Sequence, residues 1–310
     1  VLGIDCLDNY YPRFHKHRRL KILKKNRKFK FIKLDLKRFD ILKKKLNNYK
    51  IDYIIHLAAQ PGVRISISNP HNTLNQNLIS FSNIIEISRL KKVKKFIYAS
   101  SSSVYGDTKI YPFRENDFKN IPVSVYGATK LSNEIIAKSY SKNFNIKCIG
   151  LRFFTVYGPY GRPDMAYFKF TKLIENNKKI DIFNYGKMKR DFTYVDDLIE
   201  SIYRLIEIPP EKKENTKVKI AHDLTSNFAP WRVVNIGNSK PIELLKFIET
   251  LELVLNKKAI KNYLPYQRGE VLQTWSDNSL LEKLIKFKPN TELLEGIKKF
   301  INWYYEFYKI

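Results

Sequence analysis

The first two thirds of the chain alternate short apolar segments with longer segments whose apolar residues recur every three or four positions. The first pattern is typical of buried strands and the second of amphipathic helices. Strands are expected at 1–4, 29–35, 52–58, 95–100 and 146–152, with helices beginning near Phe39 and spanning 74–90 and 125–142. Strands that alternate with helices form a parallel sheet. The sequence therefore predicts an α/β, doubly wound fold whose ligands bind at the carboxyl ends of the strands.

From about residue 160 the rhythm changes. The patterns predict short strands at 180–184, 190–195 and 232–236, helices at 165–177, 197–208, 241–256 and 292–308, and a polar loop from Pro209 to about 227. We expect a smaller domain that caps the sheet. Residues 1–160 would form the sheet domain, with 190–208 and 232–240 returning to it, while 161–189 and 241–310 would form most of the smaller domain.

Composition limits the classes of partner. The 57 Lys and Arg residues exceed the 30 Asp and Glu residues and give a net charge of +27, but they are spread along the chain, so we interpret them as a solvated surface and expect no nucleic-acid partner. No apolar run approaches the roughly 18 residues of a membrane span, and we expect a cytoplasmic protein with no membrane partner. Cys6 and Cys148 offer no disulfide framework, and His15 and His17 are read as solvated loop residues, so no metal site is expected.

The front of the chain lacks one expected feature. In a dinucleotide-binding sheet, a glycine-rich turn follows the first strand and an acidic residue comes about 20 residues later. Asp5 ends the first expected strand and suits that acid, yet no Gly-x-Gly occurs anywhere in the chain. Either the cofactor site is of another kind, or the first strand, the glycine turn and the first helix lie before Val1. We expect the second.

Tyr126 and Lys130 form the most informative pair of polar residues. Four positions apart on a helix, they share one face, and a nearby ammonium lowers the pKa of a phenol and makes it a better general base. The spacing recurs at Tyr105/Lys109, Tyr185/Lys189 and Tyr305/Lys309. Only Tyr126 begins a helix that follows a cluster of serines at a strand end, residues 100–103.

Several motifs together resemble the extended short-chain dehydrogenase/reductases that modify nucleotide sugars. They are Asp5, Asp35-Leu36, His56-Leu57-Ala58-Ala59, the stretch from Ala99 to Gly106, Tyr126-x-x-x-Lys130 and the stretch from Arg152 to Gly158. Segments 158–165, 184–197 and 235–238 are most similar to the UDP-glucuronate 4-epimerases of that family. The resemblance spans almost all 310 residues.

The resemblance implies a Rossmann-like NAD-binding domain, a UDP-sugar domain and a homodimer formed through the helices near 74–90 and 125–142. It implies the cofactor-binding residues Asp5, Asp35, Leu36, Leu57, Ala58, Ala59, Asn77, Ser100, Tyr126, Lys130 and Phe153. Tyr126 would act as base at the C4 hydroxyl, with Lys130 and Ser101 as its catalytic partners. Ser101, Ser102, Ser103, Thr155 and Arg162 would hold a uronate. Arg190 and Arg268 would hold the pyrophosphate.

Ser102 and Ser103 separate related reactions. Family members that dehydrate or decarboxylate the sugar carry acidic residues at these positions, and hydroxyls cannot replace them. The resemblance therefore implies 4-epimerisation of UDP-glucuronate to UDP-galacturonate through a 4-keto sugar, for a surface polysaccharide such as lipopolysaccharide or capsule. Two alternatives stay open: a 4-epimerase of a neutral UDP-hexose, with Arg162 a solvated loop residue, and a non-catalytic remnant that binds a UDP-sugar or a partner without NAD.

Overall fold

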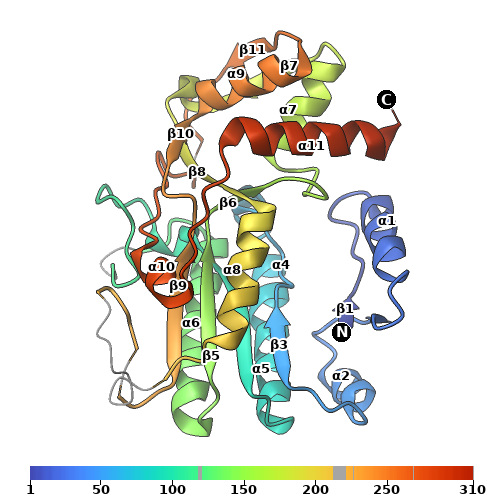
Figure 1. Cartoon of the computed structure of the whole chain (residues 1–310), viewed down its shortest axis with the longest axis vertical. Coiled ribbons are helices and arrows are strands. Elements are labelled where there is room, and N and C mark those ends of the chain that lie inside the picture. Colours follow the sequence, from blue (N-terminus) through green and yellow to red (C-terminus); the bar gives the residue numbers. More distant parts are fainter. Residues whose placement is uncertain (118–120, 212–220, 226, 268, 310) are drawn as a thin grey trace.

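The computed structural model describes residues 1–117, 121–211, 221–225, 227–267 and 269–309. The chain forms two lobes, a larger one around a parallel sheet and a smaller one above the carboxyl ends of its strands (Figure 1). The expected α/β architecture with a parallel sheet is confirmed.

Four parallel strands form the central sheet, in the order β3, β4, β5, β9. Their bounds are Tyr53–His56 (β3), Lys95–Ser101 (β4), Cys148–Phe153 (β5) and Trp231–Ile236 (β9). Every residue of β4 is buried. A strand with both faces covered needs apolar side chains on both, which is why 95–100 has no polar alternation.

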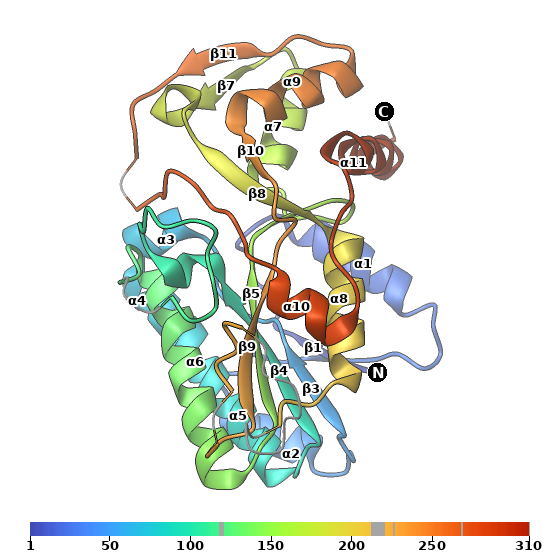
Figure 2. The same ribbon diagram turned by 60° about the vertical axis from the view of Figure 1, so that its left-hand side comes forward.

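Helices cover the two faces of this sheet (Figure 2). α5 (Ser80–Leu90) and α6 (Val125–Phe144) pack on the face that carries Phe96 and Tyr98. α8 (Val195–Glu207) and α10 (Ser279–Ile285) pack on the opposite face, against Ile97 and its neighbours. The chain between β3 and α5 is helical too, as α3 (Val63–Ser68), α4 (Pro70–Leu74) and a single π-helical turn, η1 (Asn75–Ile79).

The first two strands form a separate sheet. β1 (Leu2–Asp5) pairs in parallel with β2 (Lys30–Lys33), and α2 (Phe39–Leu46) follows. Within the described residues, β3 is an edge of the four-stranded sheet. On one of its faces the side chains of Tyr53 and Ile55 are 44% and 41% exposed.

The smaller lobe is built around aromatic side chains. β8 (Lys189–Tyr194) pairs with β6 (Thr155–Tyr157) and with β10 (Pro241–Glu243), while β7 (Lys179–Ile182) pairs with β11 (Ile260–Tyr263). Three helices pack on these strands: α7 (Ala166–Glu175), α9 (Leu244–Leu255) and α11 (Leu293–Tyr308). Phe192 of β8 stacks on Phe247 of α9, with 4.6 Å between ring centroids.

The structure corrects two details of the sequence interpretation. Residues Arg13–Leu23 form a helix, α1, rather than a basic loop. His15 of this helix is 2% exposed and stacks on Phe307 of α11, so it is not solvated. Burial lowers the pKa of His15 to about 4, which keeps the ring neutral in its aromatic surroundings.

Among the residues that the structure describes, no helix is long and apolar enough to span a membrane. Over the same residues, no group of three or more His, Cys, Asp and Glu side chains is arranged to hold a metal ion.

Candidate active site

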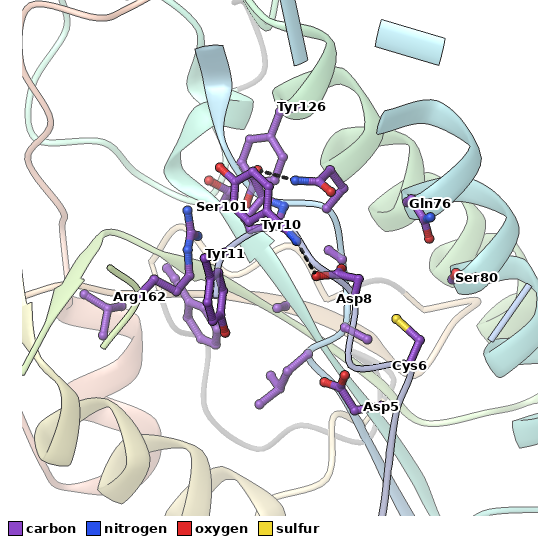
Figure 3. Close-up of a pocket in the computed structure, with 18 of the residues that line it drawn as sticks. Asp5, Cys6, Asp8, Tyr10, Tyr11, Gln76, Ser80, Ser101, Tyr126 and Arg162 are labelled. Atoms are coloured by element: carbon purple, nitrogen blue, oxygen red, sulfur yellow. Dashed lines mark hydrogen bonds between the residues drawn. The ribbon is translucent and has the colours of Figure 1, made fainter. Parts of the chain in front are cut away.

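Two cavities meet where the strands of the central sheet end. The first has a volume of about 480 Å³ and lies along the ends of β1 to β5, and the second, of about 390 Å³, reaches into the smaller lobe. Ser101, Tyr126 and Arg162 line both. Figure 3 shows these three side chains at one end of the first cavity, and Asp5 and Cys6 at the other.

The first cavity collects the residues expected to bind a cofactor. Its lining includes Asp5, Asp35, Leu36, Leu57, Ala58, Ala59, Ser100, Tyr126, Lys130 and Phe153. Asn77 is not among them, because its side chain is buried behind the cavity wall. There it accepts a hydrogen bond from the backbone N–H of Gln60 at 2.7 Å and donates to Thr129 of α6 at 3.0 Å. Asn77 therefore fixes the loop after β3 to α6.

The start of α6 fits closely against the serine cluster. The hydroxyl of Ser124 accepts a hydrogen bond from the N–H of Gly127 at 3.1 Å and caps the helix. A Cβ at Gly127 would lie 2.7 Å from the carbonyl oxygen of Ser103. Only glycine permits this approach, which brings Tyr126 to the end of β4.

Lys130 lies one turn along the same helix and is buried. Its ammonium donates a hydrogen bond to the carbonyl oxygen of Ala99 at 2.9 Å, and burial lowers its pKa to about 8. Burial raises the pKa of the Tyr126 phenol, while hydrogen bonding with Ser101 and the positive charge of Arg162 act in the opposite direction. The ammonium lies 5.9 Å from the centroid of the Tyr126 ring. The hydrogen bond of the ammonium thus goes to the Ala99 carbonyl, and the ammonium faces the Tyr126 ring as a nearby positive charge.

The serine cluster turns away from the sheet in a short 3₁₀ helix, η2 (Ser102–Tyr105). The hydroxyl of Ser101 accepts a hydrogen bond from the N–H of Ser103 and donates to its hydroxyl, both at 3.2 Å. Ser102, Ser103 and Thr155 line the second cavity. No carboxylate is present on η2, whose four residues are Ser, Ser, Val and Tyr.

A buried ion pair lies behind the site. Arg152 of β5 and Glu134 of α6 are joined by two hydrogen bonds of 2.9 and 2.8 Å, and their side chains are 1% and 3% exposed. Glu134 also accepts a hydrogen bond from Ser100 at 2.5 Å, and Arg152 donates to the hydroxyl of Tyr105 at 2.9 Å. The pair thus connects α6 and η2 with the ends of β4 and β5. Nearby, burial raises the pKa of Glu115 to about 7.

The arginines expected to bind substrate have partners within the chain. Arg162 donates two hydrogen bonds to Asp164, at 3.0 and 2.5 Å. Arg190 lines the second cavity, donates to the carbonyl oxygens of Lys189 and Leu272, and lies 3.8 Å from Glu270. Arg268 lies outside the described residues.

The model of the NAD dependent epimerase/dehydratase family matches residues 3–221. The chain belongs to this family. It is 45% identical over 309 residues to Protein CapI of Staphylococcus aureus, covering 100% of this chain and 92% of that protein. It is 42% identical to a probable UDP-glucuronate 4-epimerase of Rhizobium meliloti, with 100% and 91% covered.

One solved structure similar to this epimerase-family chain is the UDP-glucuronic acid 4-epimerase of Bacillus cereus in complex with UDP-glucuronic acid and NAD. The TM-score is 0.86 at 35% identity, covering 99% of this chain and 91% of that one.

Three site residues of this family member were not assigned a role from the sequence. Arg64 of α3 lines the second cavity and donates hydrogen bonds of 2.8 and 2.5 Å to Glu270. Tyr10 lines the first cavity, and its hydroxyl donates a hydrogen bond of 3.0 Å to Asp164. No local pattern marks Arg64 or Tyr10, since each acquires its place through a partner from a distant segment, whereas Asp164 also pairs with Arg162 two residues before it. Glu134 had one signal, its position four residues after Lys130 on the same helix face.

Proposed function

We propose that this chain is a UDP-glucuronate 4-epimerase that uses NAD. The observation that carries the proposal is the meeting of Ser101, Tyr126 and Arg162 at the junction of the two cavities. A hydroxyl pair and a cation at one point suit the removal of a proton from a sugar hydroxyl beside a carboxylate. The names of the relatives support the same substrate.

The first cavity fits the cofactor at both of its ends. Asp5, at the end of β1, can accept hydrogen bonds from ribose hydroxyls, and the small side chains of Ala58 and Ala59 leave room along the sheet edge. Tyr126 and Lys130 would lie at the nicotinamide end. Bound there, NAD would supply a reversible hydride acceptor for C4 of the sugar.

The protein's own residues perform the proton transfer. Tyr126 takes the proton of the C4 hydroxyl directly or through Ser101, which lines the same junction and lowers the pKa of the phenol. The charge of Arg162 makes this transfer easier because it lowers the pKa of the phenol. Loss of this proton together with a hydride to NAD would give a 4-keto sugar, and hydride delivered to the opposite face of that sugar would invert C4.

A 4-keto uronate is a β-keto acid that loses CO₂ readily, so the site has to hold its carboxylate firmly. The hydroxyls of Ser101, Ser102, Ser103 and Thr155 offer donors, and Arg162 offers charge. The absence of carboxylates from η2 supports epimerisation over dehydration or decarboxylation. Arg190 and Arg268 would bind the pyrophosphate.

The linings of the cavities support the division into domains. Residues 1–160, with 190–208 and 232–240, would form the NAD-binding domain, since the first cavity lies along the ends of β1 to β5, while β6 and β8 extend from it into the smaller lobe, where Thr155 and Arg190 line the second cavity. Residues 161–189 and 241–310 would bind the UDP-sugar, since Phe170, Phe183 and Leu244 line the second cavity.

We also propose a cytoplasmic homodimer that serves surface polysaccharide synthesis. Leu74, Ile79 and Ile135 of the helices around α5 and α6 are 40%, 45% and 64% exposed, which supports pairing through these helices. The two free thiols, Cys6 and Cys148, suit a reducing compartment.

The test is conversion of UDP-glucuronate in the presence of NAD, followed by NMR of the anomeric protons, with UDP-glucose in parallel. We expect UDP-galacturonate to form and UDP-glucose to react at least tenfold more slowly. Tyr126→Phe should lower kcat by a factor of about 100 or more because it removes the proton acceptor. Tyr185→Phe is the matched control, since Tyr185 has a lysine at the same spacing but is 55% exposed on the smaller lobe.

Equal rates on UDP-glucuronate and UDP-glucose would contradict the proposal that the substrate is a uronate and would favour a 4-epimerase of a neutral UDP-hexose. Binding of UDP-glucuronate without any stabilisation by NAD and without turnover would favour the non-catalytic alternative.

A further inference from the structure

The pairing of Arg162 leaves only part of its guanidinium available to a ligand. A guanidinium presents five N–H groups in a fixed plane. In Arg162 the Nε and Nη2 groups donate to the two carboxylate oxygens of Asp164, at 3.0 and 2.5 Å. This pair fixes the plane of the guanidinium, and the Nη1 group forms the remaining edge. Both side chains are partly buried, at 31% and 27% exposed, so solvent screens the pair only in part.

Asp164 is itself held by a distant part of the chain. The hydroxyl of Tyr10, in the segment between β1 and α1, donates to Asp164 Oδ2 at 3.0 Å. The Tyr10 ring also lies 6.0 Å from the Cζ atom of Arg162, and burial raises the pKa of its phenol, which keeps it protonated as a donor. Asp164 thus receives hydrogen bonds from both Arg162 and Tyr10, and can turn only if both are broken.

The segment that carries Tyr10 is anchored to the loop that carries Arg162. Arg19 of α1 donates to the carbonyl oxygen of Gly161 at 2.8 Å and to the hydroxyl of Tyr11 at 2.9 Å. Figure 3 shows Tyr10 and Tyr11 beside Arg162 at the end of the cavity where Ser101 and Tyr126 lie. The orientation of Arg162 is therefore set by Asp164 of its own loop, which is held in turn from a distant segment.

From this geometry we infer that Asp164, held by Tyr10, is the positioning residue that orients Arg162 at the junction of the cavities, and so determines how well the site distinguishes an acidic sugar from a neutral one. The inference rests on the proposed function, since it concerns the carboxylate of the same substrate. Asp164 touches neither the reacting atoms nor the sugar and acts only through Arg162.

A double-mutant cycle tests this inference. Asp164→Asn should lower kcat/KM for UDP-glucuronate by about 10- to 100-fold, because a misplaced charged group costs this much at a reacting centre. Tyr10→Phe, which removes one hydroxyl, should cost severalfold. In the Arg162→Ala background, Asp164→Asn and Tyr10→Phe should each change kcat/KM by less than about twofold, since residues that act through one group are not additive.

The same cycle is measured on the dissociation constants of UDP-glucuronate and UDP-glucose by calorimetry. Asp164→Asn should weaken the binding of UDP-glucuronate and leave the dissociation constant of UDP-glucose unchanged. If Asp164 had only a structural role, its substitution would weaken the binding of both sugar nucleotides. Glu200→Gln is the matched control, because Glu200 also accepts a hydrogen bond from an arginine, Arg204, but on α8 away from both cavities. It should leave kcat/KM and both constants unchanged.

Additive losses in the cycle would overturn the inference, because they would mean that Asp164 acts independently of Arg162. A gain in affinity for UDP-glucuronate in Asp164→Asn would also overturn it, since Asp164 would then compete with the substrate for Arg162. A wild-type chain that binds UDP-glucuronate but does not convert it would contradict the proposed function, while the cycle in dissociation constants would still test the positioning of Arg162. Tyr10→Phe alters only a partly buried hydroxyl and keeps the test valid if Asp164→Asn does not fold.

Discussion

Single side chains in this site owe their charge state to burial. Lys130 and Glu115 both have pKa values shifted toward neutrality, to about 8 and about 7, and both shifts arise mainly from lost hydration. For Lys130 the carbonyl of Ala99 is a neutral partner, so the ammonium contributes its charge without being cancelled by an acid. Glu115 has one oxygen bonded to the backbone N–H of Asn235 at 2.9 Å.

The raised pKa of Glu115 predicts that the stability of the fold depends on pH. Its pKa lies near 4.5 when unfolded and near 7 when folded, so between these values the folded chain must hold a proton that the unfolded chain has lost. Stability should fall as the pH rises from 4.5 to 7 and stay reduced above it. In Glu115→Gln this fall should be smaller by up to about 3 kcal/mol, measured as the free energy of unfolding in urea at pH 5 and pH 8.

Glu249→Gln serves as the control for the surface, since Glu249 is an exposed acid of α9. An identical pH dependence in wild type and Glu115→Gln would show that Glu115 is not the group responsible.

Among single residues, the sequence indicated those that lie within a contiguous motif. Ser101, Tyr126 and Lys130 could be identified because a strand end and a helix start carry them. Tyr10 could not, because its role depends on a contact with Asp164, 154 residues away, and the sequence does not show that Asp164 pairs with Arg162 in the folded chain. The same holds for the partner of Lys130, a backbone carbonyl, which no side-chain pattern reveals.

Among the elements, α6 is held to the sheet by charge as well as by packing. The ion pair of Glu134 with Arg152 crosses from α6 to β5 inside the protein, where each charge depends on the other for compensation. This pair and the close contact at Gly127 fix the helix at two points along its length. Tyr126 directly precedes Gly127, and Lys130 lies between Gly127 and Glu134, so these two contacts fix the position of both side chains relative to β4.

Arg152→Met should destabilise the fold by about 3–5 kcal/mol, because it leaves Glu134 buried without its cation. Arg89→Met is the matched control. Arg89 pairs with Glu86 on α5, but its side chain is 37% exposed, so its removal should cost less than about 1 kcal/mol. The measurement is chemical denaturation of both variants. Similar losses of unfolding free energy in the two variants would mean that burial does not determine how much each ion pair stabilises the fold.

The elements that the sequence revealed are those with a continuous apolar run, in the buried strands, or a clear helical period. β4, β5, β9 and α8 follow this rule and lie close to their expected bounds. α1 was missed because its buried side is formed by His15 and Leu20 among basic residues, so that aromatic packing against α11 replaces an apolar stripe. β11 was missed because its residues become a strand only by pairing with β7.

For the whole molecule, the exposed apolar residues of the large lobe predict self-association. Ile135→Glu should convert the expected dimer to a monomer, because it places a charge on an exposed apolar position of α6. Analytical ultracentrifugation measures the change. Leu253→Glu on α9 should have no effect, although Leu253 is as exposed, at 68%. A monomeric wild type, or a dimer that persists in Ile135→Glu, would contradict this arrangement.

The sequence predicted the two-lobed organisation but not how the lobes share the site. Its periodicities placed the sheet and the smaller lobe in order along the chain, whereas the crossing of β6 and β8 between them depends on long-range pairing. Arg64 and Glu270, from opposite lobes, likewise meet only in the folded chain.

Ser101, Tyr126 and Arg162, which are among the side chains that line both cavities, also impose a thermodynamic constraint. A molecule in one cavity that moves Ser101, Tyr126 or Arg162 must change the affinity of the other cavity. Such an influence is reciprocal, so the factor by which a nucleotide sugar tightens a dinucleotide equals the factor by which the dinucleotide tightens the sugar. The two cavities therefore bind their ligands in coupled equilibria, and the affinity measured for one cavity depends on whether the other is occupied.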